Sequence, residues 1–545
     1  MSKIVKGTML LTGATFLSKL LGMLYVIPFE AMVEDTGGTL YSFAYIPYTI
    51  FISISTLGVP LAVSKFVSKY NALGDYETGR QILKSGMQLM ALTGLVSFLL
   101  MFFGAEWIAH WSVSDTNTKG NSIEDVTMVI RMVSFALLII PGMSIVRGFF
   151  QGYESMAPTA VSQVVEQIVR IVFLLGAVFI ITEIMDGSIQ LAVSFATFAA
   201  FIGALASAVV LFIYWRKRKP YLDKQLETQE YSYDLSQKSM IKELLMYAGP
   251  FVLVGVATPI YQVIDQFTFE DAMVAAGLED QAVSAFAAII LYGHKLVIIP
   301  VTLATGLSLA ILPAITKSFT EEKKGQLFKQ INQALQIVML LILPAVAGLS
   351  ILSSEAYGTI YGMQGLDLKG TLLGWYAPVA LLLGMFTVSA SILQGISQQN
   401  FAVISLGAGL LIKACLNIPL ILVFGPKGSI FATGLAVGTA VLLNLWRVKR
   451  TINIPLIAFF KRSLLMLIFT GLMAVVVFFI HWGLGGLLNA DESRIGALVT
   501  LLVGVGLGAA VYLWLAYKST LLERVLGGRI GVLDRFLKRN KGASA

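Results

Sequence analysis

Two basic residues lie next to each other in an otherwise apolar stretch, "IILYGHKLVIIP", which runs from Ile289 to Pro300. They are His294 and Lys295, and no carboxylate lies within five positions of the lysine on either side. A second lysine, Lys19, lies in the middle of the apolar stretch "ATFLSKLLGMLYVIP". An isolated ammonium group is costly in apolar surroundings, so each lysine needs a partner or water. Protonated lysines at both positions predict a water-filled cavity that receives an anion, and the alternative is a lysine buried in its neutral form.

Seven ionisable residues are singled out within the apolar stretches, five of them cations and two anions. They are Lys19, Arg131, Glu166, Arg170, Asp265, Lys295 and Lys413. Glu166 and Arg170 are four positions apart, which places them on one face of a helix and within pairing distance. This spacing predicts an ion pair, which is either structural or a switch that opens between two conformations.

The other charges have more than one interpretation. Asp265 needs a cation, and Lys413 is a candidate partner because both are expected in the second half of the protein. Arg131 begins an apolar stretch, so it either extends its charged end to the outer interface or joins the anion-binding cavity. His294 is either a hydrogen-bonded core residue or a proton relay. The candidate substrate-binding residues are therefore Lys19, Lys295, Arg131 and His294.

The composition indicates the class of protein. The chain has 545 residues, of which 57% are hydrophobic and only 13% charged, whereas soluble domains carry about 25% charged residues. Apolar stretches of spanning length recur along the chain, which predicts an all-α polytopic membrane protein. The net charge of +8 indicates basic cytoplasmic loops and not nucleic-acid binding. The single cysteine, Cys415, excludes an intrachain disulfide.

Motifs for catalysis or ATP use are missing from the sequence. There is no P-loop, no glycine-rich dinucleotide motif before a helix and no HExxH metal motif. ATP-driven pumping and catalysis are therefore not expected. We expect a protein that is not an enzyme and that needs neither a cofactor nor a metal ion.

Fourteen membrane-spanning helices are predicted, since a hydrocarbon core of about 30 Å requires about 20 apolar residues of helix. Their approximate limits are 7–29, 41–66, 84–104, 127–150, 157–183, 189–215, 244–269, 284–313, 330–353, 371–394, 401–424, 428–446, 464–486 and 495–517. If the N-terminus is inside, the even-numbered loops and both tails carry most of the lysines and arginines, as in "WRKRKP" and "RVKR". This pattern predicts that both termini are cytoplasmic.

The two halves of the chain resemble each other. The segments "FFQGYESMAPTAVSQVVEQIVRIVFLL" and "ILQGISQQNFAVISLGAGLLIKACLNI" align at an offset of 243 residues. Two six-helix repeats in the same orientation are typical of transporters that bind substrate between their halves. The predicted domains are an N-lobe (1–215), a cytoplasmic linker (216–243), a C-lobe (244–446), two appended helices (447–517) and a basic cytoplasmic tail (518–545).

Four segments carry a resemblance to a known family. They are "ATFLSKLLGMLYVIPF", "IPYTIFISISTLGVPLAVSKFVSKY", "RGFFQGYESMAPTAVSQVVEQIVR" and "LYGHKLVIIPVTLATGLSLAILPAITKSF". Over nearly its whole length the chain resembles the lipid II flippase (MurJ/MviN) family. It resembles most closely the Gram-positive YtgP/SpoVB branch of the multidrug/oligosaccharidyl-lipid/polysaccharide (MOP) exporter superfamily.

The resemblance implies a fold, a substrate and partners. The fold would be two six-helix bundles arranged as a V, followed by two helices (447–517) that shape a lateral groove for a lipid tail. The substrate would be lipid II, an undecaprenyl-pyrophosphate disaccharide-pentapeptide. Membrane lipids and proteins of cell-wall synthesis are the other expected partners, and the expected location is the bacterial cytoplasmic membrane.

The resemblance also assigns residues. Lys19 and Lys295 occupy the places of the basic residues that, in the family, face the central cavity from spans one and eight. Further arginines of the family in spans one and two are replaced here by apolar and aromatic residues, as near Tyr25. Some members bind sodium through an aspartate in span seven and polar residues in span eleven, which Asp265 and Asn417 match. Lys413 lies one turn before Asn417 and is expected to replace the sodium charge, so these residues are read as the remnant of an ion site.

The favoured hypothesis is that the protein moves lipid II from the inner to the outer leaflet by alternating access. The head group would bind in a cationic central cavity, and the membrane potential or an ion gradient would drive the movement. A flippase for another undecaprenyl-linked glycan, such as a teichoic acid, capsule or spore cortex precursor, is the first alternative. A multidrug antiporter would need unpaired carboxylates and usually has twelve spans. A scaffold for cell-wall synthases would have no use for unpaired charge in the membrane.

Overall fold

The computed structural model describes residues 3–56, 58–113, 121–229, 238–242, 244–246, 256–455 and 457–526. This described part of the chain is built of helices and contains no strand, as the all-α prediction requires. It divides into two compact units, Met1–Ala287 and Ala288–Ala545.

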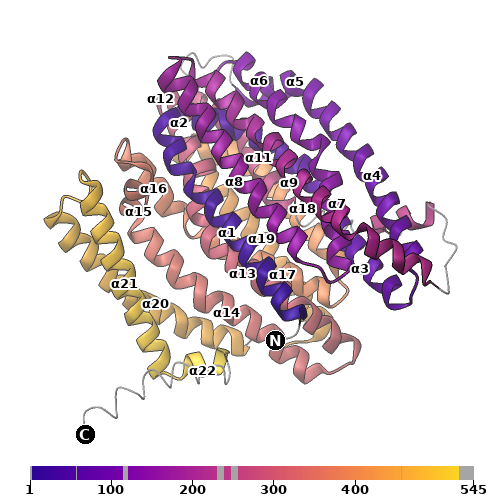
Figure 1. Cartoon of the computed structure of the whole chain (residues 1–545). Helices are drawn as coiled ribbons and strands as arrows, with labels where there is room; N and C mark the ends of the chain where they lie inside the picture. Colours follow the sequence, from indigo (N-terminus) through magenta and orange to yellow (C-terminus); the bar gives the residue numbers. More distant parts are fainter. Residues whose placement is uncertain are drawn as a thin grey trace, which may run out of the picture. The chain divides into compact units, whose positions relative to one another are not determined.

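The first unit is coloured from indigo to magenta in Figure 1. Its helices are α1 (Lys3–Leu24), α2 (Val26–Thr56), α3 (Val59–Ala72), α4 (Tyr76–Phe103), α5 (Ala105–Ser112), α6 (Ile123–Ser134), α7 (Ile140–Gly152), α8 (Ala157–Phe179), α9 (Ile189–Glu227), α11 (Ala257–Ala275) and α12 (Glu279–Phe286). A 3₁₀ turn, Phe135–Leu138, precedes α7, and a π-helical turn, Ile180–Ile184, follows α8.

Polar residues fix where several of these helices begin. The Asp75 carboxylate accepts the backbone N–H of Thr78 at 2.9 Å and caps α4. Ser122 and Asp125 form a reciprocal capping box at the start of α6. Each cap satisfies a backbone N–H that has no partner within the helix, which is typically worth about 1 kcal/mol. These helix ends are therefore set by local chemistry as well as by the length of the apolar run.

The first long apolar segment is interrupted at Glu34. The backbone of Glu34 has φ 54° and ψ −165°, so α2 consists of two helical pieces separated by a kink. Positive φ is uncommon for a residue other than glycine and marks a turn. The candidate spanning segment Gly13–Ile54 has 42 residues, about twice the length that one crossing requires. The interruption thus divides this segment into two pieces of spanning length.

Close approach between helices of the first unit depends on glycine. A Cβ atom at Gly203 of α9 would lie 2.8 Å from the carbonyl oxygen of Glu166 and 2.9 Å from the Cβ of Arg170, both on α8. A Cβ at Gly148 of α7 would lie 2.4 Å from the carbonyl oxygen of Pro60 on α3. Small residues are typical of such contacts in membranes, where van der Waals packing holds helices together.

Replacing Gly203 with leucine is expected to destabilise the first unit by about 1–3 kcal/mol, the usual cost of overpacking a tight contact. The added side chain would separate α9 from α8 at the level of Glu166. Gly176→Leu is the matched control, because no atom lies within 4 Å of a Cβ at Gly176 on α8. Thermal unfolding of the purified protein in detergent measures both variants. Equal midpoints for the two would contradict the tight α8–α9 contact.

The second unit comprises the remaining described helices. They are α13 (His294–Thr320), α14 (Lys324–Ile351), α15 (Ser353–Tyr361), α16 (Leu366–Tyr376), α17 (Val379–Gly395), α18 (Gln399–Phe424), α19 (Lys427–Ile452), α20 (Ile457–Leu487), α21 (Arg494–Lys518) and α22 (Leu521–Leu526). A π-helical segment, Ala287–Gly293, leads directly into α13. Figure 1 shows α20 and α21 side by side, and α14 packs against α20.

A buried polar network joins three helices of the second unit. The amide of Asn444 on α19 accepts the Ser405 hydroxyl of α18 at 2.5 Å and donates to the Ser389 hydroxyl of α17 at 3.1 Å. All three residues are fully buried. Hydrogen bonds of this kind add to the packing forces that hold helices together in a membrane. They fix α17, α18 and α19 as one bundle.

Twelve helices in the described part of the chain are long and apolar enough to cross a membrane. Two differences separate this number from the predicted fourteen. The first two predicted spans, 7–29 and 41–66, both overlap the single candidate segment Gly13–Ile54, and the predicted seventh span, 244–269, lies partly outside the described residues. The multi-pass architecture is therefore established, and the count of fourteen stays a prediction.

The predicted lobes and the compact units divide the chain at different places. The linker was expected at 216–243, but α9 continues as a helix to Glu227. Helices α11 and α12, which follow the expected linker, pack against α2 and belong to the first unit. The predicted tail, 518–545, lies mainly outside the described residues. The lobe organisation accordingly remains a proposal.

Candidate functional site

An arginine on α7 organises a polar cluster in the first unit. The Arg147 guanidinium donates through Nη2 to Glu166 Oε2 on α8 and to the Ser207 hydroxyl on α9, each at 2.7 Å. Its Nε donates to the Ser162 hydroxyl at 2.9 Å. The side chains of Arg147 and Glu166 are only 15% and 23% exposed. One charge-assisted pair therefore ties three apolar helices together.

Glu166 was predicted to pair with Arg170, but in the structure it pairs with Arg147. Glu166 binds Arg147, whereas Arg170 donates through Nη2 to the Tyr41 hydroxyl at 2.9 Å and lies 5.1 Å from the ring centre of Tyr45. Spacing along one helix does not reveal a cation that approaches from another helix. Arg147 falls within the predicted span 127–150, so it could have been counted among the intramembrane charges.

Arg170 lies in a group of tyrosines on α2 and at the junction between α1 and α2. The Tyr41 and Tyr45 rings stack with centres 5.3 Å apart, and the hydroxyls of Tyr25 and Tyr41 are 3.2 Å apart. The Nε of Arg170 is buried and has no hydrogen-bond partner among the residues that the structure describes. Buried donors of this kind are rare in proteins. This group is a buried polar cluster in the first unit.

Lys19 lies on α1, which packs along α8. The Thr15 hydroxyl donates to Gln163 Oε1 at 3.3 Å, and the Ser18 hydroxyl to the Gln163 carbonyl at 3.5 Å. Lys19 itself is exposed within this unit. The hypothesis of an anion-binding cavity requires an accessible ammonium group, and the exposure of Lys19 meets this requirement. The anion that it would bind stays a prediction.

In the second unit, His294 and Lys295 form the first residues of α13. The π-helical segment before them, Ala287–Gly293, is of a type often found at functional sites. His294 Nδ1 lies 2.8 Å from the Tyr376 hydroxyl. His294 thus makes the hydrogen bond that is expected if it is a core residue and not a proton relay. Lys295 is half-buried and lies one helical turn before Ile299.

The predicted ion-site residues are deeply buried in their respective units. Lys413 Nζ donates to the Thr433 hydroxyl at 2.6 Å, and Lys413 and Asn417 are both completely buried. Asp265 is 3% exposed and belongs to the first unit, whereas Lys413 and Asn417 belong to the second. The Asp265–Lys413 pair and the remnant ion site therefore stay predictions.

Helices α11 and α12 are held against α2 by several contacts. The Ser284 hydroxyl donates to Asp35 Oδ2 at 2.7 Å, and the Thr39 hydroxyl donates to the Val283 carbonyl at 3.1 Å. Deeper in the contact, the Gln266 amide donates to the Phe43 carbonyl at 3.1 Å. The space left here is about 10 Å³, about the minimum that one water molecule requires. We call this contact the α2–α12 closure.

An apolar groove of about 550 Å³ lies within the second unit. Its walls come from α13, α14, α20 and α21, with Ile299, Gly348, Met473, Gly504 and Tyr512 among the lining residues. Because Ile299 lies one turn after Lys295 on α13, a cation lies close to one wall of the groove. An apolar groove beside a cation suits an amphiphile with an anionic head and a long hydrocarbon tail.

An acid–base pair that the sequence analysis did not single out lies beside this groove. Glu355 of α15 bonds to His481 Nδ1 of α20, and Glu355 is only 1% exposed. Leu352 and Val477, which line the groove, precede the two residues by about one helical turn each. The sequence feature that could have identified this pair is the single carboxylate, Glu355, in "LSSEAYGTIY".

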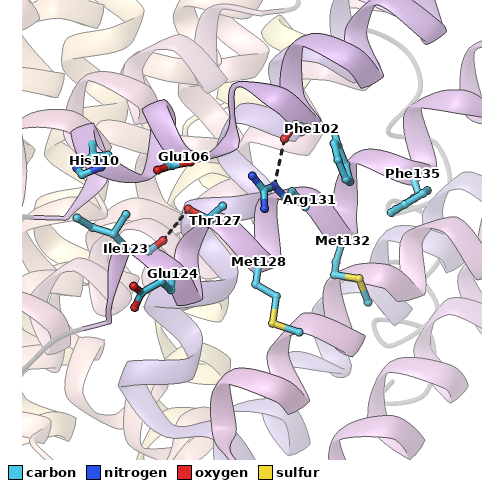
Figure 2. A pocket seen from close by; sticks show the side chains of 10 residues that line it. All are labelled: Phe102, Glu106, His110, Ile123, Glu124, Thr127, Met128, Arg131, Met132 and Phe135. Atoms are coloured by element: carbon cyan, nitrogen blue, oxygen red, sulfur yellow. Dashed lines mark hydrogen bonds between the residues drawn. The ribbon is translucent and has the colours of Figure 1, made fainter.

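Arg131 lies in a different place from the other candidate residues. It lines a cavity between α4, α5 and α6 of the first unit, together with Glu106, His110 and Glu124 (Figure 2). Lys19 is not among the residues that line this cavity. The structure therefore separates Arg131 from Lys19 within the unit to which both belong.

These features define a polytopic α-helical transporter, with charged side chains inside apolar helices and an apolar groove. A family profile described as "Polysaccharide biosynthesis protein" matches residues 4–319. The lipid II flippase MurJ of Bacillus subtilis (strain 168) is 45% identical over 97% of this chain and 98% of its own length. The chain belongs to the MurJ flippase family.

Other relatives and solved structures agree with this assignment. Stage V sporulation protein B of the same bacterium is 24% identical over 98% of this chain and 99% of its length. A solved structure of lipid II flippase MurJ in an inward closed conformation has a TM-score of 0.66 at 18% identity, covering 95% of this chain and 99% of that chain. An inward-facing multidrug resistance transporter of the MATE family has a TM-score of 0.61 at 15% identity, covering 81% and 99% of the two chains. Both structures share the fold.

Proposed function

We propose that this protein is a lipid II flippase that carries its substrate from the inner to the outer leaflet of the bacterial plasma membrane. The observation that carries this proposal is the 45% identity to a curated lipid II flippase along almost the entire length of both chains. The proposal also includes cytoplasmic locations for both termini, because the predicted inner loops and tails hold most of the basic residues.

The charges and the groove suit the two parts of this substrate. Lys19 and Lys295 would bind the pyrophosphate, for which lysine is a suitable point-charge partner. The groove would hold the undecaprenyl chain, whose hydrocarbon matches its apolar walls. The proximity of Lys295 to Ile299 supports this division, because in the substrate the pyrophosphate is joined directly to the hydrocarbon chain.

The membrane potential is a sufficient source of energy for the movement. A pyrophosphate diester carries about two negative charges, and an inside-negative potential favours outward movement by about 2.3 kcal/mol per charge per 100 mV. No ATP-binding motif is present in the sequence. The proposed mechanism is alternating access, in which the cavity opens first to one leaflet and then to the other. Proteins of cell-wall synthesis are proposed partners that would supply or use the substrate.

The α2–α12 closure is the proposed outer gate. It joins the part of α2 that follows the kink at Glu34, in the first predicted outer loop, to the start of the predicted eighth span. Asp35 and Ser284 make one of its hydrogen bonds, and we place them at the outer, aqueous end of the proposed transport path. Opening to the outer leaflet would require these contacts to break, so the closure corresponds to a state that faces inward.

Cross-linking this gate is expected to stop flipping. In a protein with Cys415→Ala, the pair Asp35→Cys and Ser284→Cys would be joined by a short bifunctional reagent that forms a disulfide with each thiol. Lipid II flipping by the reconstituted protein should fall about tenfold or more and return when the link is cleaved by reductant. Each single-cysteine variant serves as a control for the reagent. Undiminished transport by the linked protein would remove the gate from the mechanism.

The substrate itself is tested by comparison with related glycolipids. Purified protein in vesicles should move fluorescently labelled lipid II, and cells depleted of the protein should accumulate lipid II on the inner leaflet. Another undecaprenyl-linked glycan is the alternative substrate. Accumulation of that other lipid, with normal outward movement of lipid II, would overturn the proposal.

A further inference from the structure

The cavity that contains Arg131 has a volume of about 650 Å³ and lies within the first unit. Three helices form it: the end of α4, the short helix α5, and α6 with the 3₁₀ turn that follows it. Its lining residues are Phe102, Glu106, His110, Ile123, Glu124, Thr127, Met128, Arg131, Met132 and Phe135. None of these residues has a role in the proposed flipping mechanism.

The lining is polar toward one end and apolar toward the other. Figure 2 shows His110, Glu106 and Glu124 on one side, Phe102, Met132 and Phe135 on the other, and Arg131 between them. Two carboxylates and one guanidinium thus face the same space as a group of thioether and aromatic side chains. A cavity of this kind suits an amphiphilic ligand that carries charges of both signs.

The guanidinium of Arg131 is positioned but not neutralised by the protein. Its Nε donates to the Phe102 carbonyl at 3.4 Å, and the guanidinium lies 5.6 Å from the centre of the Phe102 ring. Within the described residues, its Nη groups have no hydrogen-bond acceptor and no carboxylate forms an ion pair with it. A planar cation fixed at one edge is well suited to bind a phosphate through its remaining donors.

The neighbouring surface indicates that the cavity lies at a membrane interface. Trp107 and Trp111 of α5 are 63% and 57% exposed, and Phe103 at the end of α4 is exposed as well. Tryptophan is enriched where the hydrocarbon meets the head groups. Met128, which lines the cavity, is also exposed. A lipid could therefore reach the cavity from the bilayer.

We propose that this cavity is a binding site for a membrane phospholipid whose head group bears both a phosphate and a primary ammonium. The phosphate would bind Arg131, and the ammonium would bind Glu106 and Glu124. The upper part of the acyl chains would contact Met128, Met132 and Phe135. The two carboxylates disfavour a purely anionic head group, and a quaternary ammonium cannot donate hydrogen bonds to them. Phosphatidylethanolamine has the required chemistry.

The test uses the full-length protein in detergent micelles that contain phosphatidylethanolamine, phosphatidylcholine or phosphatidylglycerol. Native mass spectrometry measures how much lipid each variant retains. The wild type should retain phosphatidylethanolamine about tenfold better than the other two lipids, which corresponds to about 1.4 kcal/mol. Arg131→Gln should lose this retention. The double variant Glu106→Gln/Glu124→Gln should still bind lipid but should no longer discriminate against phosphatidylglycerol.

Matched controls separate the site from general effects of charge. Arg216 is exposed and lies 5.3 Å from the Phe212 ring, so Arg216→Gln removes a comparable guanidinium elsewhere in the first unit. Glu183→Gln removes an exposed carboxylate. Both controls should keep the wild-type lipid preference. Equal retention of all three lipids by the wild type, or an unchanged preference in Arg131→Gln, would overturn the assignment. Because lipid retention is measured without transport, failure of the flippase proposal would leave this result unaffected.

Discussion

Replacing either Lys19 or Lys295 with alanine is expected to reduce lipid II flipping about tenfold or more. A hydrogen bond to a charged group contributes about 1.5–3 kcal/mol, and loss of 1.4 kcal/mol already corresponds to a factor of ten. Each lysine is proposed to contribute such a bond to the pyrophosphate. Transport of labelled lipid II by the reconstituted protein is the measurement. Because the proposed role depends on charge, Lys19→Arg and Lys295→Arg should keep more activity than the alanine variants.

Lys217→Ala is the control for loss of positive charge. Lys217 is exposed in the basic segment "WRKRKP", away from the proposed cavity residues in the sequence. Its alanine variant should transport normally, and all variants should be produced at the same level with the same unfolding temperature. Full transport by both Lys19→Ala and Lys295→Ala would contradict the proposed binding of the head group.

Filling the apolar groove is the second change with a large expected effect. Gly348 lines the groove, and no atom lies within 4 Å of a Cβ built at this position. Gly348→Phe can therefore fit without disturbing the helix packing, while its ring occupies space that we assign to the hydrocarbon chain. Flipping is expected to fall about tenfold or more, since loss of about 1.4 kcal/mol of van der Waals packing between the chain and the groove walls already corresponds to a factor of ten.

The matched variant for this test is Gly506→Phe. Gly506 on α21 also has no atom within 4 Å of its built Cβ, but it is exposed and does not line the groove. Both variants place the same ring on a helix of the second unit, so both should unfold at a similar temperature. If Gly348→Phe transports as well as Gly506→Phe does, the hydrocarbon chain does not occupy this groove.

Sequence alone predicted the helical class and most spans, because twenty-residue apolar runs have few alternatives in a membrane. It also predicted the family, through segments on either side of Lys19 and Lys295. The interruption at Glu34 was not predicted, since it depends on one backbone conformation within a continuous apolar stretch. Arg147 was missing from the seven predicted intramembrane charges, although it lies in the predicted span 127–150.

The partners of these charges were harder to predict than their positions. The i, i+4 rule places Arg170 near Glu166, but Arg147 approaches from α7 and binds the carboxylate instead. Helix crossings decide such competition, and they depend on contacts such as Gly203 with α8. The groove was expected at 447–517 from the family resemblance. Two of its four walls come from α13 and α14, which lie far earlier in the chain.

The π-helical segment Ala287–Gly293 has a consequence for the direction of Lys295. Such a segment holds an additional residue that an α-helix would not accommodate in the same rise. If the same residues wound instead as a regular α-helix, the additional residue would turn everything after it by about 100°. The ammonium of Lys295 would then point to another side of α13, although every neighbouring residue type was retained. Orientation of this cation is thus determined by the local winding of the helix as much as by residue identity.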